Sequence, residues 1–560
     1  MAVNLSRIDI LIISTYLFGI VTLGFWAGSR RRKGGEVNHY FLAGNTLTWP
    51  VIGLAMFAAN ISTVHLVSLA ESAYKYGLIY GNFEWMAGFA LVLLSLLFAP
   101  LYLRSRVATL PDYLERRYNR KCRDWLAVIS IVSAIVIHIG VTLYTAAWVL
   151  RGVLGINPAA TIMGIDALMF FIIILSLLTG LYTMVGGLLS VVLTESAQTV
   201  LLLAGAVAIT VIGYVKIGGW SALVSTLATH PHPMAGMLGS NVTWGTGNFL
   251  SMLRPAGDPS GLPWYAIFLG YPVLGIWYWC CEQTIVQRVL AARDEKQARL
   301  GPLFCAFIKI LPVFLFVLPG VMCVALVQKG MLGSGPKTAA DTYTFMIMHL
   351  LPGGLRGLVA AAMLAAAMQA CSAGLNSTAT LVSYDIVKRR RPDTGDHQLV
   401  LVGKITTVVA TVLAIVLSPI FGHYGTIIEG LNKLISFIAP PITTVFLFGV
   451  FWKRASGKAA YITLVSGALA GVVMFFLDWK GWISGNFMMT ALYLLLMCSA
   501  LMIAASYFYP EPLKEESKSL VWQSWREPFG GKGGGRALGD YRVLSGLLVV
   551  LLIVLYCLFR

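Results

Sequence analysis

The stretch AANISTVH, residues 58–65, lies at the middle of a hydrophobic run that begins near Trp49 and ends near Ala73. A run of this length can cross a membrane, since about 20 apolar residues span the hydrocarbon core. Its centre nevertheless holds four polar side chains, those of Asn60, Ser62, Thr63 and His65. Polar groups and unwound backbone at membrane depth are tolerated where they are buried in protein or line a cavity. The stretch therefore predicts a helix that opens at its centre to bind something.

A purely structural interpretation of the same residues stays open. Ser62 and Thr63 can hydrogen-bond back to carbonyls one turn earlier in the helix. Asn60 can hold neighbouring helices together by a side-chain hydrogen bond. In the binding interpretation, Asn60 and His65 instead supply donors and acceptors to a ligand.

The composition is that of a polytopic membrane protein. Of the 560 residues, 58% are hydrophobic and 12% are charged, and the mean hydropathy is +0.78. Soluble domains of this size have a more polar composition. The net charge of +17 does not indicate a nucleic-acid partner, because the basic residues cluster beside hydrophobic segments, where membrane topology explains them.

The hydropathy pattern contains fourteen candidate membrane spans, which we place at about 8–29, 48–74, 78–103, 123–154, 160–184, 187–214, 262–284, 299–328, 353–385, 398–420, 426–451, 458–477, 487–508 and 541–559. Lysine and arginine cluster in alternate loops, at 30–33, 104–123, 293–299, 388–391, 453–458 and 514–536. Basic loops face the cytoplasm. All of these basic loops lie on the cytoplasmic side only if the chain crosses the membrane fourteen times and both termini lie outside. We therefore expect a multi-pass protein of the plasma or inner membrane with extracellular or periplasmic termini.

A second span is also interrupted. The segment 262–284 includes FLGYPVLGIWYW, in which Gly270, Pro272 and Gly275 break the helical pattern. Interrupted segments in corresponding positions of two halves indicate the central binding site of a transporter built from an inverted repeat. The two interrupted spans are the second and the seventh. This spacing predicts two five-helix repeats, spans 2–6 and spans 7–11.

The chain then divides into seven segments: the outside N-terminus, first helix and basic loop (1–47), the first repeat (48–214), an extracellular loop (215–261), the second repeat (262–451), peripheral helices (452–508), a cytoplasmic linker (509–540) and the last helix (541–560). The linker includes GGKGGG at 530–535. This sequence lacks the spacing and the trailing Ser/Thr of a phosphate-binding loop. We therefore expect a flexible connection there.

Lys309, Glu84 and Glu195 are three of the ionisable residues that lie within predicted spans. Each costs about 2.5–3.5 kcal/mol at the centre of a membrane helix, so each is a candidate functional residue. Lys309 is about ten residues into its span, close to the middle of the bilayer at 1.5 Å per residue. Glu84 and Glu195 lie nearer the ends of their spans, where an interfacial or helix-end carboxylate stays open as an alternative.

Eight stretches of the chain, in order from residue 40 to about 455, share a family pattern: YFLAGNTLTWPVIGLAMFAANIS, FEWM, ATLPDYLERRYNRK, GGLLSVVLTES, WYWCCEQTIVQRVLAAR, FIKILPVFLFVLPG, LNSTATLVSYDIVKR and APPITTVFLFGVFWKR. With them the chain resembles the sodium/solute symporter family, and within it the sodium/glucose cotransporters. The resemblance implies an all-α polytopic protein with the leucine-transporter fold. That fold is a 5+5 inverted repeat, here with additional helices at both ends.

The resemblance also implies a set of polar substrate ligands: Asn60, His65, Glu84, Lys309 and Asn432. At position 432 the family more often has glutamine. The resemblance further implies that Tyr278 is the aromatic gate beneath the sugar, with Trp279 beside it. The chemistry agrees, because a polyol needs a few well-placed polar groups in an otherwise apolar pocket. Ala87 and Gly275 stand where bacterial galactose-type members can have polar side chains. The identity of the sugar stays open.

The resemblance implies a sodium site between spans 2 and 9, held by backbone carbonyls and two adjacent serine hydroxyls. Those two positions are Gln369 and Ala370 in this chain. Oxygens remain on the Gln369 side chain and on the carbonyls of Ala58, Ile61 and Ala366. We therefore expect sodium to be the coupling ion, bound at a degenerate site.

Some family members hold a second cation between a carboxylate of span 6 and serines of span 9. Glu195 and Ser372 match part of that site, whereas Ala373 does not. The expected function is sodium-coupled uptake of a sugar or related polyol by alternating access. The change at positions 369 and 370 keeps three alternatives open: an uncoupled carrier, a proton-coupled carrier and a substrate sensor. A membrane enzyme is disfavoured, because the sequence has no HExxH motif and no acidic cluster.

Overall fold

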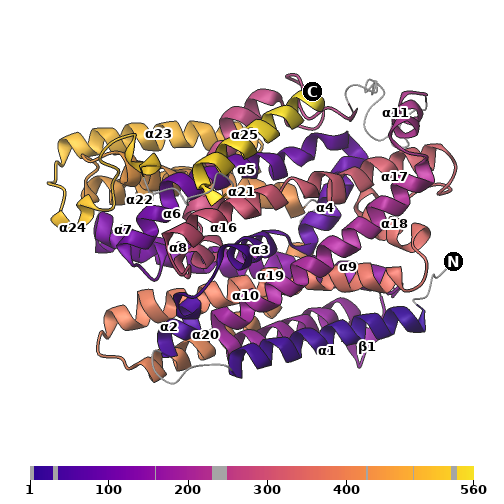
Figure 1. The fold of residues 1–560 in the computed structure, drawn as a ribbon, viewed down its shortest axis with the longest axis horizontal. Coiled ribbons are helices and arrows are strands. Elements are labelled where there is room, and N and C mark those ends of the chain that lie inside the picture. The colour runs from indigo at the N-terminus through magenta and orange to yellow at the C-terminus, as the bar shows by residue number, and fades with distance from the viewer. Residues whose placement is uncertain are drawn as a thin grey trace.

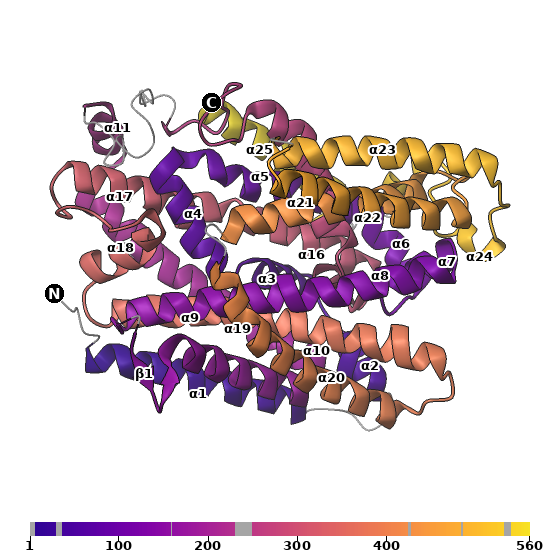
Figure 2. The same ribbon diagram turned by 180° about the vertical axis from the view of Figure 1, so that it is seen from behind.

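The structure is a computed structural model, and it describes residues 6–29, 36–157, 159–229, 249–423, 427–482, 485–530 and 539–560. Long helices lie side by side along the horizontal direction of Figure 1, and the reverse view in Figure 2 shows the same arrangement. The described strands form one short hairpin, β1 (Thr161–Ile162) with β2 (Ile165–Asp166), in which Thr161 pairs with Asp166. The predicted all-α architecture is confirmed.

Eleven helical segments among the described residues are long and apolar enough to cross a membrane, and two shorter apolar helices accompany them, Trp49–Asn60 and Ala266–Cys281. The longest segment, Ala167–Ile217, has 51 residues. At 1.5 Å per residue it is more than twice as long as the hydrocarbon core of about 30 Å. It also turns at Gly187, whose backbone leaves the helical region. The number of fourteen spans stays a prediction.

The first predicted repeat contains α3 (Trp49–Asn60), α4 (Thr63–Tyr76), α5 (Asn82–Leu93), α6 (Ala99–Ser105), α7 (Leu110–Arg117), α8 (Arg120–Ser133), α9 (Thr142–Val153) and α10 (Ala167–Ile217). Short tight or wide turns join them: η2 (Gly77–Gly81), η3 (Leu94–Phe98) and η4 (Ala134–Val141). Pro50 lies in the first turn of α3, where its missing N–H costs nothing.

The second predicted repeat contains η5 (Ala266–Gly270), α14 (Tyr271–Ile276), η6 (Trp277–Cys281), α15 (Gln283–Leu290), α16 (Glu295–Ile308), η7 (Val313–Val317), α17 (Leu318–Gln328), η8 (Ala339–Asp341), α18 (Thr342–Leu350), α19 (Leu355–Leu381), η9 (Val382–Lys388), α20 (Asp396–Leu417), η10 (Ser418–His423) and α21 (Ile427–Phe451). The remaining elements are α1 (Arg7–Ser29), α2 (Glu36–Leu42), η1 (Ala43–Asn45), α11 (Trp220–Thr229), α22 (Gly457–Trp479), α23 (Phe487–Phe508), α24 (Glu515–Lys518), η11 (Glu527–Phe529) and α25 (Tyr541–Leu558). Residues 230–248 of the predicted extracellular loop and 531–538 of the predicted linker lie outside the described residues.

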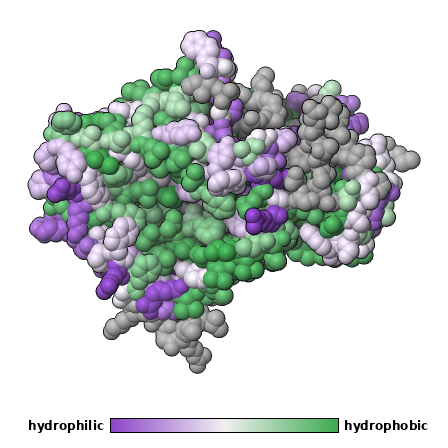
Figure 3. All heavy atoms as spheres, turned by 90° about the horizontal axis from the view of Figure 1, so that it is seen from above, coloured by the Kyte–Doolittle hydropathy of each residue, from purple (hydrophilic) through white to green (hydrophobic). Residues whose placement is uncertain are grey.

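The centre of the bundle is built around α19, which packs against α10, α1, α3 and α4. Its sequence is rich in alanine, and nearly every residue from Val359 to Leu381 is buried. Small side chains let helix backbones approach closely, which is how helices associate in a membrane. Peripheral helices such as α20, α22 and α23 instead expose large apolar side chains. The middle of the face in Figure 3 is mostly hydrophobic, as a lipid-facing surface should be.

The predicted interruption of the span 262–284 is displaced from the expected glycines and proline. The backbone stays helical through Pro272 and Gly275, in α14 between the π-helical turns η5 and η6. The non-helical residue is Glu282, whose carboxylate caps α15. The wide π turn before α14 accommodates Pro272. Gly270 instead allows close packing, since a Cβ there would lie 2.5 Å from the backbone of Met488.

The predicted flexible linker is partly fixed in place. Leu520, Val521 and Trp522 are buried. The Tyr113 hydroxyl donates to the Leu520 carbonyl at 2.9 Å, and the Ser517 hydroxyl donates to a carbonyl of α7 at 2.6 Å. Three apolar residues within a polar stretch were the signal for this docking.

We expect Gly187→Ala to destabilise the fold. Gly187 has φ +62° and ψ −158°, a region that only glycine adopts readily, with a strain of about 1–3 kcal/mol for other residues. An added Cβ would also lie 2.4 Å from the Tyr40 carbonyl oxygen. The measurement is the melting temperature of the purified protein. The control is Gly546→Ala on the exposed face of α25, where nothing lies within 4 Å of the new methyl group. A Gly187→Ala protein as stable as the control would contradict the strain.

Candidate functional site

The broken helix at AANISTVH has the predicted form. Helix α3 ends at Asn60, Ile61 and Ser62 have extended backbone, and α4 begins at Thr63. The Ser62 backbone N–H donates to Nδ1 of His65 at 3.3 Å, and the Ser62 hydroxyl lies 3.2 Å from the same nitrogen. Serine is favoured at such a helix start because its side chain satisfies unpaired backbone groups. The sequence therefore encodes the break, and the break positions Asn60 and His65.

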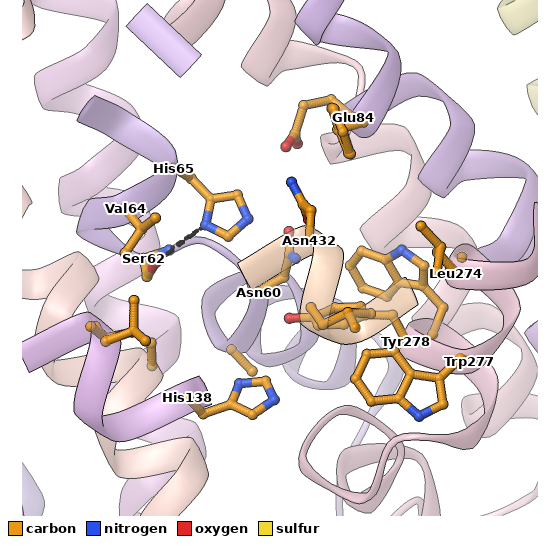
Figure 4. Close-up of a pocket in the computed structure, with 18 of the residues that line it drawn as sticks. Asn60, Ser62, Val64, His65, Glu84, His138, Leu274, Trp277, Tyr278 and Asn432 are labelled. Carbon is orange, nitrogen blue, oxygen red and sulfur yellow. Dashed lines mark hydrogen bonds between the residues drawn. The ribbon is translucent and has the colours of Figure 1, made fainter. Parts of the chain in front are cut away.

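A cavity with about 930 Å³ of empty space lies against this break. All seven predicted substrate residues line it: Asn60, His65, Glu84, Tyr278, Trp279, Lys309 and Asn432. Figure 4 shows that His65, Glu84, Asn432 and Tyr278 approach the same space from different sides. The residues come from both predicted repeats and meet beside the non-helical segment of the first. This is the arrangement in which a small solute can be enclosed.

Lys309 is the buried cation of the cavity. It is 1% exposed, and its ammonium donates to Oδ1 of Asn60 and to Oε2 of Glu84. It follows the last residue of α16, where the helix dipole favours a cation. Trp279 adds an aromatic face, with its ring centroid 5.5 Å from the ammonium nitrogen. The ammonium charge is thus compensated by a carboxylate, an amide oxygen and an aromatic ring.

The aromatic residues of η6 form one wall of the cavity. The rings of Tyr278 and Trp279 meet edge to face, with centroids 5.2 Å apart. Trp279 is buried at 2% exposure, whereas Tyr278 is only partly buried because its ring borders the cavity. The π-helical geometry of η6 rotates these neighbours relative to a regular helix. Both predicted aromatic residues therefore border the site.

The cavity also includes His138, which was not predicted. It lies in the π-helical turn η4 and is 6% exposed. Its ring centroid is 6.1 Å from that of Tyr278, and its Nε2 lies 3.7 Å from Oε1 of Glu282. The available signal was a single ionisable residue inside an apolar span, the same signal that identified Lys309.

The predicted cation-site residues Ala58, Ile61, Ala366 and Gln369 are all fully buried. Gln369 reaches the helix break, since its Nε2 donates to the Ile61 carbonyl at 3.0 Å. Among the described residues, its Oε1 has no hydrogen-bond partner. Ala370 lines the solute cavity instead. The Ile61 carbonyl, which a bound cation would use, is thus already hydrogen-bonded to the Gln369 amide.

These groups form an oxygen shell for a sodium ion only after a rearrangement. A sodium ion would need the Ile61 carbonyl, which requires the Gln369 amide to turn away and to present its unpaired oxygen. The structure supplies carbonyl and amide oxygens for this purpose, but positions 369 and 370 contribute no hydroxyl group. The donor set therefore fits a cation in part.

At the predicted second cation site, the Glu195 carboxylate is already paired with an arginine of this chain. Oε1 of Glu195 lies 2.5 Å from Arg288 Nη2, and both side chains are fully buried. The Ser372 hydroxyl donates to the Gln369 carbonyl at 2.9 Å. Within the part of the chain that the structure describes, Oε2 of Glu195 has no hydrogen-bond partner. The arginine thus supplies a positive charge where a bound cation was predicted.

Comparisons with known proteins agree with this architecture. The model of the "Sodium:solute symporter family" matches residues 40–467. Rat sodium/glucose cotransporter 2 is 34% identical over 83% of this chain and 71% of the relative. The sodium/mannose cotransporter SLC5A10 of Bos taurus is 31% identical over 99% of this chain and 96% of the relative.

A solved structure of a Na⁺-coupled sialic acid symporter, in a substrate-bound outward-open state, has the same fold. The TM-score is 0.73 at 23% sequence identity, over 91% of this chain and 99% of the other. This likeness confirms the predicted leucine-transporter fold. The family match over most of the chain confirms the resemblance read from the sequence motifs. The chain therefore belongs to the sodium:solute symporter family of membrane transporters.

Proposed function

We propose that the chain takes up a sugar or a related polyol by alternating access, with sodium as the coupling ion. The observation that supports this most is the single cavity that collects an amide, an imidazole, a carboxylate, an ammonium group and an aromatic wall. Such a set suits a neutral ligand with several hydroxyl groups. Similar proteins are named sodium/glucose, sodium/mannose and sodium/myo-inositol cotransporters.

In this proposal, Lys309 and Glu84 act as substrate ligands while they remain paired with each other. The ammonium group has three N–H donors, two of which face Asn60 and Glu84. The third and the remaining carboxylate oxygen can meet substrate hydroxyls. The Lys309 ammonium and the Glu84 carboxylate together carry no net charge, so the pair suits an uncharged solute better than an anion.

Sodium would be held by the carbonyls of Ala58, Ile61 and Ala366 and by the Gln369 amide oxygen, and it would supply positive charge between α3–α4 and α19. A second candidate function rests on the hydrogen bond from Gln369 to Ile61. This bond joins the same helices without an ion and favours an uncoupled carrier, a proton-coupled carrier or a sensor.

We also propose that the protein resides in the plasma or inner membrane with both termini outside, since the basic loops support that orientation.

We expect Lys309→Ala and Glu84→Ala each to weaken substrate binding. Loss of a hydrogen-bond partner in a buried site costs about 1–3 kcal/mol, or about ten- to a hundredfold in affinity. The measurement is binding and uptake in proteoliposomes, over a panel of hexoses, polyols, sialic acid and monocarboxylates. The control is Lys433→Ala, since Lys433 neighbours Asn432 in the sequence but pairs with Asp478 at 3.2 Å. Parent-like binding by both cavity variants would show that the site is misplaced.

We expect Tyr278 to close the cavity by stacking on the substrate. Tyr278→Phe keeps the ring and should reduce uptake only mildly, whereas Tyr278→Ala removes the aromatic wall and should reduce it severely. Stacked aromatic pairs contribute about 0.5–1.5 kcal/mol beyond the buried area, which sets the scale for a stacking contact here. Initial uptake rates of the best substrate provide the comparison. Equal and mild effects of the two changes would remove the gate role.

We expect the double variant Gln369→Ser with Ala370→Ser to show stronger stimulation of uptake by sodium than the parent. The change removes the amide donor from the Ile61 carbonyl and adds two hydroxyl oxygens of the kind that hard cations prefer. Uptake in sodium and in potassium, with and without a proton gradient, separates the coupling modes. Sodium coupling is rejected if replacing potassium with sodium leaves the parent's affinity and uptake unchanged. Binding without uptake would indicate a sensor.

A further inference from the structure

A second hollow lies where α21 ends, at the end of the molecule that holds the basic loops. It has about 760 Å³ of empty space and is lined by Phe451, Trp452, Lys453, Arg454, Trp522, Gln523, Ser524, Trp525 and Pro528. One wall is the turn between α21 and α22. The other is the docked part of the segment after α23. None of these residues borders the solute cavity.

The two walls are held together by specific contacts. The Trp522 backbone N–H donates to the Val450 carbonyl at 3.0 Å, and its indole N–H donates to the Leu97 carbonyl at 2.9 Å. The rings of Phe451 and Trp525 stack with centroids 5.6 Å apart and 18° between their planes. The hollow is therefore a built feature of the fold.

The hollow contains two cations with neutral partners. Lys453 donates to the Gln523 carbonyl at 3.3 Å, and Arg454 donates to the Tyr507 hydroxyl at 3.4 Å. Within the described residues, neither side chain lies within ion-pair distance of a carboxylate, and both are exposed. A third exposed cation, Lys458, stacks its ammonium 3.7 Å from the Tyr509 ring. This arrangement leaves positive charge available for an anion.

The hollow lies at the ends of apolar helices, where the headgroup layer of a membrane is expected. The part of α21 after Lys433 and the whole of α23 are mostly apolar, and both helices end beside the hollow. Large aromatic side chains are exposed at this level, Trp525 at 80% and Phe508 at 81%. Aromatic residues gather where membrane and water meet, and basic pockets on the cytoplasmic side of membrane helices bind anionic headgroups.

We propose that this hollow binds the phosphate-bearing headgroup of an anionic phospholipid in the cytoplasmic leaflet. Lys453 and Arg454 contact the phosphate, and the Trp525 ring packs against the glycerol and the first methylene groups. A soluble phosphate compound shares the charged part of this chemistry. The aromatic walls favour the lipid, because an isolated phosphate ion gains nothing from an apolar face.

The test is native mass spectrometry of the full-length protein in detergent, titrated with phosphatidylglycerol or with phosphatidylcholine of the same acyl chains. We expect the parent to retain phosphatidylglycerol preferentially. Each neutralised cation should weaken that binding by about fivefold, so Lys453→Gln with Arg454→Gln should weaken it by more than about tenfold. The matched control is Lys480→Gln, whose cation lies 5.3 Å from the Trp479 ring just beyond the opposite end of α22.

Parent-like retention of phosphatidylglycerol by the double variant, or equal retention of the two lipids by the parent, would overturn the proposal. Competition by inorganic phosphate at concentrations comparable to the lipid would also overturn it, in favour of a soluble ligand. The lipid-free melting temperature shows whether the double variant is folded. If it is not, the two single variants are compared instead, each with an expected fivefold loss (about 1 kcal/mol per cation).

Discussion

The ammonium group of Lys309 is the point on which the central site depends. It lies just past the end of α16 and bonds to Asn60 at the end of α3 and to Glu84 in the first turn of α5. Removal of either partner from a buried ion pair leaves an uncompensated charge, which costs about 3–5 kcal/mol. Three helices from two repeats therefore share one electrostatic constraint. A solute that binds there meets a surface whose charges are already balanced.

The helix break is tolerated at membrane depth because it is buried and paired with protein groups. The residues at the break are buried, with Ile61 and Ala58 at 0% exposure. The Ser62–His65 cap satisfies one end, and Thr63 donates from the break to the Met363 carbonyl of α19 at 2.9 Å. Backbone groups that would be costly in lipid are thus paired with protein. The break can open to a ligand because neighbouring residues satisfy the hydrogen bonds of its own polar groups.

The motifs and the hydropathy pattern predicted the fold. The family resemblance predicted seven residues that line the solute cavity, and the cost of charge in an apolar span separately singled out Lys309 and Glu84. Other features depend on three-dimensional packing that no local pattern reports. Glycine and proline predicted a break at Pro272, whereas the capping carboxylate of Glu282 places it later. His138 enters the cavity through a π-helical turn, which has no reliable sequence signature. The orientation of the Gln369 amide likewise depends on the carbonyl opposite it.

The Gln369–Ile61 hydrogen bond has a consequence for how steeply such a carrier can concentrate its solute. One monovalent ion moving through 100 mV releases about 2.3 kcal/mol, which corresponds to a concentration ratio of about fiftyfold. That ratio is reached only if the solute crosses solely together with the ion. In the proposed carrier, an amide that joins the helices in the ion's absence would permit crossing without the ion, and each such event would dissipate the gradient. A transporter with this tether would act best where the imported solute is consumed quickly inside the cell.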